Sequence, residues 1–136
     1  MPVSFEFDGR ILVLRLAGIY PPAHIRAALV AALAEPRSRP LNGVLVDVSE
    51  SQSLVTRTLG DMTSIVGFLA YHAAAFGNRV ALVASSDVAY GMVRMAAEDL
   101  RTAGIAASAF RDGSEARRWL QPPPSRDASP DANAAR

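Results

Sequence analysis

Apolar residues at alternating positions predict a β-hairpin at the start of the chain. Every second residue of residues 3–7 and 10–16 is apolar, a period that is typical of strands. Asp8-Gly9 stands between the two runs, and this dipeptide favours a two-residue turn because both residues tolerate positive φ. Ile11 and Val13 make the second run apolar on its other face, so we expect residues 3–7 at the sheet edge. The apolar residues expected to share one face are Phe5, Phe7, Leu12, Leu14 and Leu16.

Two later runs predict buried strands. Residues 43–48 are apolar at both odd and even positions, which is typical of a central parallel strand with both faces covered. Residues 79–84 repeat this pattern, and residues 106–110 form a short last strand. Asp47 interrupts the first run near its carboxyl end, where binding sites in α/β sheets tend to lie.

Four segments with apolar residues at helical spacing alternate with these strands. The first helix follows Pro21-Pro22 and ends at Glu35, and the second begins near Thr56 or Thr58 and ends at Phe76. Ser85-Ser86-Asp87 supplies the N-cap of the third helix, and Asp112 with Glu115 has capping-box spacing for the fourth. The residues expected to face the sheet are Ile25, Leu29, Ala32 and Leu33; Leu59, Met62, Ile65, Val66, Leu69, Ala73 and Phe76; Val88, Met92, Met95, Ala96 and Leu100; and Ala116, Trp119 and Leu120.

The order of these elements predicts an α/β domain. An N-terminal β-hairpin feeds repeated strand–helix units, so we expect a mixed, mainly parallel five-stranded sheet with right-handed crossovers. The domain spans residues 1–120. Residues 121–136 lack any apolar period, and we expect them to form a disordered C-terminal tail.

Composition narrows the function classes. The net charge of +1 argues against a nucleic-acid-binding face. The chain has no lysine, which excludes a Walker-type phosphate loop and a Schiff-base enzyme, and no cysteine, which excludes disulfides and thiolate metal sites. No signal peptide and no uncharged run long enough to span a membrane is visible, so we expect a cytoplasmic protein.

The sequence shows no residue pattern typical of a catalytic site or a metal site. His24 and His72 are the only histidines, and no carboxylate cluster gives them the spacing of a metal site. No Gly-x-Ser-x-Gly elbow is present to supply a nucleophile. We therefore expect no enzyme activity, no metal and no cofactor.

Polar residues gather at the predicted carboxyl edge of the sheet, where two interpretations stay open. Asp47 either binds a partner or forms hydrogen bonds with the serine-rich loop that follows it. Hydroxyl groups near two helix starts either hold an anion or cap the helices and solvate the loops. The candidate residues of this switch loop are Asp47, Ser49, Ser53, Thr56, Thr58, Ser85 and Ser86.

Residues 62–77 contain no charged side chain, which is unusual for a surface helix. The side opposite the core carries Phe68 and Tyr71 among small residues, with His72 at its margin. This side is either covered by a neighbouring helix or exposed as a patch for a ligand, a second copy or a membrane surface. The candidate ligand or partner residues are Met62, Phe68, Tyr71, His72 and Tyr90.

Several short motifs occur in an order that resembles a bacterial STAS-like (SpoIIAA-like) domain. Asp47-Val48-Ser49 ends a strand, Tyr90-Gly91-Met92-Val93-Arg94-Met95 lies in a helix, and Phe110-Arg111-Asp112 precedes Glu115-Ala116 and Trp119-Leu120. The resemblance covers residues 5–120. It implies a small α/β fold, shared with the lipid-binding Sec14 group, and a binding or regulatory module that is not an enzyme.

The resemblance implies two candidate functions. Stand-alone SpoIIAA-like proteins lead us to expect binding of an apolar small molecule or lipid, with self-association as a homodimer or peripheral association with a membrane. The alternative is a protein-interaction switch with a regulatory protein partner, as in the anti-sigma factor antagonists. Those proteins carry Asp-Ser-Ser-Gly at the helix start after the central strand, where this chain has Val55-Thr56-Arg57-Thr58. A phosphorylatable hydroxyl near Thr56 or Thr58 would then carry the switch.

Overall fold

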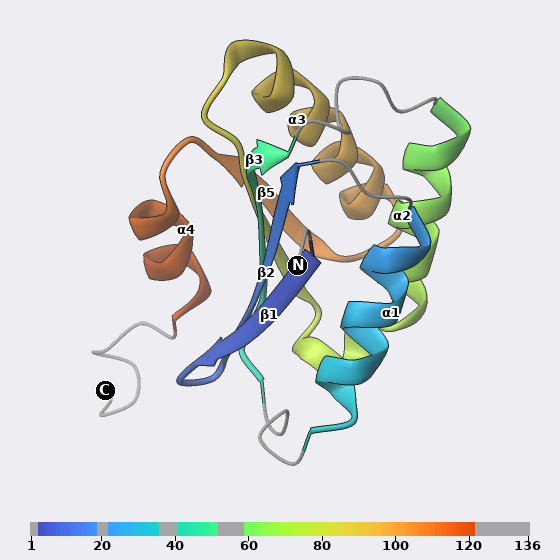
Figure 1. The fold of residues 1–136 in the computed structure, drawn as a ribbon, viewed down its shortest axis with the longest axis vertical. Helices are drawn as coiled ribbons and strands as arrows, with labels where there is room; N and C mark the ends of the chain where they lie inside the picture. The colour runs from blue at the N-terminus through green and yellow to red at the C-terminus, as the bar shows by residue number, and fades with distance from the viewer. Residues whose placement is uncertain (1–2, 19–21, 36–40, 52–58, 122–136) are drawn as a thin grey trace, which may run out of the picture.

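The computed structural model describes residues 3–18, 22–35, 41–51 and 59–121, without the side chains of residues 22 and 59–64. Five strands form one sheet in sequence order, as Figure 1 shows. The first two strands are antiparallel and the other neighbours are parallel, which confirms the predicted mixed sheet. The strands are β1 (Val3–Asp8), β2 (Ile11–Gly18), β3 (Gly43–Ser51), β4 (Arg79–Val83) and β5 (Ala106–Phe110).

The helices cover the two faces of the sheet unequally (Figure 1). All three crossovers between parallel strands step in the same direction, so the right-handed rule places their helices on one face. The fourth helix follows the last strand and lies on the other face. The helices are α1 (Pro22–Leu33), α2 (Leu59–Tyr71), α3 (Asp87–Thr102) and α4 (Gly113–Leu120), and a 3₁₀ helix, η3 (Ala73–Phe76), follows α2.

The N-terminal hairpin forms as predicted, with its turn one residue later. Asp8 pairs with Ile11, so the two loop residues are Gly9 and Arg10. Gly9 has a φ of 62°, the sign that hairpin turns of this length require at the first loop position. β1 lies at the sheet edge, as expected.

Two apolar layers hold the sheet. Alternate residues of β2, such as Leu12 and Leu14, point into the larger core beneath α1, α2 and α3. Ile11 and Val13 point the other way, into a smaller core beneath α4. β3 and β4 contribute to both layers, which explains why residues 43–48 are apolar on both faces. Phe5 and Phe7 pack against the larger core, so the predicted shared face is confirmed.

The second helix is shorter than predicted. We expected one helix to Phe76, but α2 ends at Tyr71 and η3 continues the chain as a tighter turn. Gly77 then adopts a left-handed φ of 82°, and the N–H of Asn78 donates to the carbonyl of Ala73 at 2.8 Å. The tighter turn brings the carbonyl of Ala73 within reach of this N–H. The last carbonyls of an α-helix otherwise have no partner within the helix.

The inward face of α3 also differs from the prediction. Val88 and Met95, expected to face the sheet, are 63% and 62% exposed. Ala96 and Leu100 are buried as predicted, and the other buried positions of this helix are Ala89, Val93 and Ala97. Alanine packs closely against a sheet but contributes little to a hydrophobic period, so the larger side chains of the helix suggested the wrong stripe.

Candidate functional site

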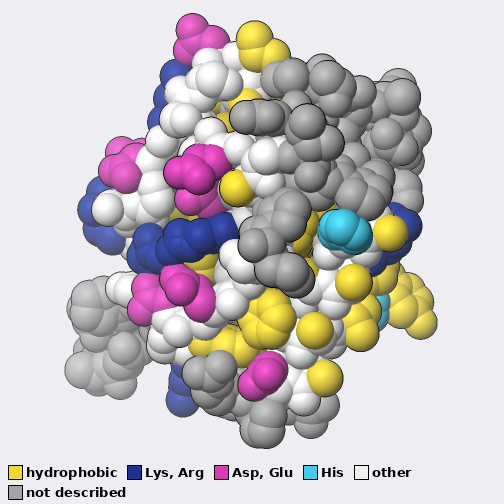
Figure 2. Space-filling model, in the orientation of Figure 1, with side chains coloured by type: hydrophobic (Ala, Val, Ile, Leu, Met, Phe, Trp, Pro, Cys, Tyr) yellow, Lys and Arg dark blue, Asp and Glu magenta, His cyan; other side chains and the backbone are white. Residues whose placement is uncertain are grey.

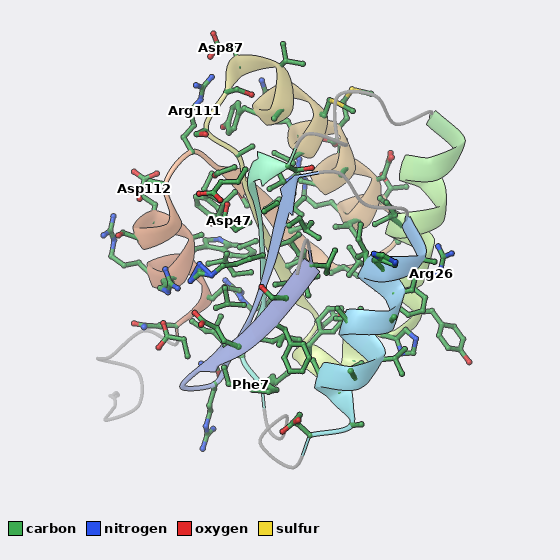
Figure 3. All side chains as sticks on the ribbon, in the orientation of Figure 1. Phe7, Arg26, Asp47, Asp87, Arg111 and Asp112 are labelled. Carbon is green, nitrogen blue, oxygen red and sulfur yellow. The ribbon has the colours of Figure 1, made fainter. Side chains whose placement is uncertain are left out.

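The structure gathers several predicted residues at the carboxyl edge of the sheet. Figure 3 shows Asp47, Asp87, Arg111 and Asp112 on this side of the molecule. Asp47 lies within β3, Asp87 follows β4, and Arg111 and Asp112 follow β5. The parallel direction of these three strands brings their carboxyl ends to one edge.

Asp47 holds an irregularity in the sheet. Arg15 pairs with Asp47 and Ala17 pairs with Glu50, so β3 carries one more residue than β2 at this point. Such a bulge removes a backbone N–H from the ladder. The carboxylate oxygen Oδ1 of Asp47 accepts the N–H of Ser49 at 3.0 Å, which supports the structural interpretation of Asp47.

Arg111 ties two loops of this edge together. Its Nη2 donates to Oδ1 of Asp87 at 2.6 Å, and its Nη1 donates to the carbonyl of Ser85 at 3.3 Å. The guanidinium carbon lies 4.6 Å from the ring centroid of Tyr90. The positive charge at this edge is therefore already paired with a carboxylate.

Local capping uses the other polar groups of the edge. The hydroxyl of Ser86 accepts the N–H of Ala89 at 3.1 Å, and Oδ1 of Asp112 accepts the N–H of Ser114 at 3.1 Å. The capping interpretation of the hydroxyl groups therefore has support at Ser86, while Ser49 and Ser85 have exposed side chains. An anion at this edge would face the carboxylates of Asp87 and Asp112.

Part of the predicted switch loop lies outside the described residues. This applies to Ser53, Thr56 and Thr58, and also to the side chain of Met62. The regulatory switch near Thr56 and Thr58 thus stays a prediction.

The side of α2 for which two interpretations were open is exposed only in part. Tyr71 is 85% exposed, but Phe68 is half-buried and packs against the larger core. Phe68 lies three residues after Ile65, which also packs against the larger core, so both are on the inward side of α2. The ring of His72 lies 4.5 Å from Phe68 and 5.0 Å from Tyr71, measured between centroids. Tyr90 belongs to the carboxyl edge, beside Arg111.

An apolar groove, absent from the sequence predictions, runs between α1 and the edge strand β1. Its volume is about 490 Å³. Figure 2 shows hydrophobic side chains gathered over β1 and α1, with charged side chains mostly on the other half of this view. The groove exists because α1 presents small side chains to the edge of the sheet, and alanines leave room that longer side chains would fill. The lining residues are Val3, Ser4, Phe5, His24, Ala27, Ala28 and Ala31.

A signal for this groove was present in the sequence. The helix Pro22–Leu33 contains one charged residue, Arg26, and apolar residues on most of its circumference. A helix of this kind needs a cover for its second face, an argument that applies to α1 as well as to residues 62–77. This face of α1 was overlooked because its apolar residues are mainly alanines, which are too small to suggest a binding surface.

Two further findings concern metal ligands and the length of the helices. Over the described ranges, no three His, Asp or Glu side chains cluster as metal ligands. None of the helices in the described part of the chain is long and apolar enough to cross a membrane.

Comparisons with known proteins bear on the fold. No protein-family model matches the sequence, and no curated protein is detectably similar to it. A solved structure from Shewanella loihica PV-4, an uncharacterised protein of the DUF3478 family with a SpoIIAA-like fold, is similar at a TM-score of 0.57. The match covers 88% of this chain and 92% of that one at 19% sequence identity. This chain has a SpoIIAA-like fold. The SpoIIAA-like resemblance of the sequence is thereby confirmed at the level of architecture, and at this identity the similarity extends to the fold alone.

Proposed function

We propose that this SpoIIAA-like chain is a non-catalytic binding module that takes an apolar small molecule or lipid chain in the groove between α1 and β1. The observation that carries the proposal is the groove itself. Its volume of about 490 Å³ falls within the range of ligand sites, roughly 300–1,000 Å³.

The lining of the groove sets the class of ligand. Val3, Phe5 and three alanines of α1 offer apolar surface, and the polar groups of Ser4 and His24 lie beside them. Ligand sites combine such apolar walls with a few polar groups that fix orientation. The groove therefore suits a ligand with an apolar body and one polar end.

The surroundings of His72 support a non-catalytic role. The ring of His72 contacts the rings of Phe68 and Tyr71, and among the described residues no carboxylate or serine is found as its hydrogen-bond partner. General acid–base catalysis needs a histidine that is oriented by such a partner.

The test uses the fluorescence of N-phenyl-1-naphthylamine, an apolar probe, with native mass spectrometry of the purified protein to detect a retained ligand. Ala27→Leu with Ala31→Leu fills the groove and should weaken binding of the probe by at least about tenfold. Ala23→Leu is the matched control, because Ala23 is exposed on the same helix and does not line the groove. Equal probe affinity in the double variant and the control would contradict the proposal.

A further inference from the structure

A second groove lies at the opposite edge of the sheet, between α3 and β5. Its volume is about 390 Å³, and its lining is more polar than that of the first groove. The lining residues are Tyr90, Gly91, Arg94, Met95, Ala97, Glu98, Arg101, Ser108 and Ala109.

The two arginines of this groove differ in their partners. Arg101 is fixed, because its Nη2 donates to Glu98 at 2.7 Å and its Nη1 donates to the carbonyl of Ala107 at 2.7 Å. Arg94 is exposed and forms no ion pair or hydrogen bond with any described residue. The two arginines and one glutamate leave one unit of positive charge, which resides on Arg94.

The contact between Arg101 and Ala107 also limits what can bind. Edge strands attract extended peptides through unpaired backbone groups, and proteins block such edges with charged side chains. Arg101 occupies the carbonyl of Ala107 in β5, so a strand added at this edge would have to displace its guanidinium. The groove is left for a small molecule.

An apolar platform lies beside the unpaired charge. Met95 is 62% exposed, and the ring of Tyr90 is backed by the guanidinium of Arg111 at 4.6 Å. Gly91 lies between them, and a Cβ at this position would meet nothing within 4 Å. Glycine inside a helix costs stability, and here its missing side chain keeps the floor of the groove open.

We propose that the groove between α3 and β5 binds a small organic anion. Its acidic group pairs with the guanidinium of Arg94, while its flat apolar body lies over Gly91 against Tyr90 and Met95. This site is independent of the groove between α1 and β1.

The test is a titration of the full chain with 2-naphthoate, followed by the backbone amide shifts of the ¹⁵N-labelled protein. The neutral 2-naphthamide is the matched probe without the charge. Shifts should concentrate at Gly91, Arg94 and Ser108, and 2-naphthoate should bind roughly fivefold more tightly, the factor that one exposed charge pair supplies. Equal affinity of the two probes, or shifts confined to other residues, would overturn the proposal.

Two variants with matched controls separate binding from folding. Arg94→Gln should remove the preference for 2-naphthoate, while Arg118→Gln, at an exposed arginine of α4 outside the groove, should keep it. Gly91→Leu should block both probes. Gly67→Leu should not, although Gly67 is likewise a helical glycine with open space around it. Both glycine variants should melt at or above the temperature of the parent, because leucine favours helix. Undiminished binding by Gly91→Leu would refute the site.

Discussion

At the scale of single residues, the side chains at the carboxyl edge mainly complete the backbone. Asp47 accepts the N–H that the bulge in β3 removes from the ladder, and Asp112 and Ser86 do the same for helix starts. This role could be predicted from the sequence, because short polar side chains at strand ends and helix starts commonly form hydrogen bonds with the local backbone. The bulge itself could not be predicted, since it depends on the register between β3 and β2.

The role of Asp47 can be tested by two substitutions. Asp47→Ala should lower the free energy of unfolding by about 1 kcal/mol, because the N–H of Ser49 loses its acceptor. Asp47→Asn keeps an acceptor oxygen and should stay within about 0.5 kcal/mol of the parent. Urea denaturation monitored by circular dichroism measures both values. An equal loss in the two variants would mean that Asp47 acts through its charge.

At the scale of elements, α4 is a short helix held by its last turn. The Nη2 of Arg79 donates to the carbonyl of Trp119 at 2.7 Å, and its guanidinium carbon lies 4.1 Å from the centroid of the Trp119 ring. Phe110 contacts the same ring at 5.7 Å. Eight residues are too few for a stable isolated helix, so these contacts and the buried Ala116 and Leu120 determine whether α4 docks.

Trp119→Ala should therefore destabilise the domain. A fully buried tryptophan would cost about 3–5 kcal/mol, and the half-buried position of Trp119 reduces the expectation to about 2–3 kcal/mol. Trp119→Phe is the milder control and should lose less, since it keeps a ring against Phe110 and Arg79. Thermal unfolding with the loss of near-ultraviolet dichroism gives the comparison. A loss of stability near zero in the alanine variant would mean that the contacts of Trp119 do not hold α4 against the sheet.

The elements also show where prediction from the sequence succeeds. Strands rich in valine and leucine were found in the right place, because their runs are apolar on both faces. The first of them was predicted over residues 43–48, and β3 continues to Ser51. Part of the predicted inward face of α3 was wrong, because Val88 and Met95 are exposed while the smaller Ala89 is buried. The groove beside α1 was missed because its alanines did not suggest a binding surface, although they create the space. The groove beside α3 also depends on the distance between that helix and β5, which the sequence pattern does not give.

At the scale of the whole molecule, the two grooves lie at opposite edges of one sheet. The first adjoins β1 and the second adjoins β5, with three strands between them. Sites that share no residues and lie well apart usually act independently.

We therefore expect binding at the two grooves to be additive. Saturating 2-naphthoate should change the Kd of N-phenyl-1-naphthylamine by less than about twofold. Fluorescence titration of the parent with and without 2-naphthoate measures this, and the Arg94→Gln variant shows whether any change passes through the second groove. Direct competition would indicate that both probes share one groove.

The sequential order of the strands has a consequence for how the chain is made. Each strand pairs only with the strands that directly precede and follow it in the chain. During synthesis the β1–β2 hairpin is complete before β3, β4 and β5 are made. Each later strand can therefore pair with the exposed edge of a strand that has already been synthesised. No late segment has to be inserted between two earlier ones, so the loop-closure entropy of each step stays that of a single crossover. β5 is then the last strand to join the sheet. Arg101, which donates to the carbonyl of Ala107 in β5, belongs to α3 and is synthesised before that strand.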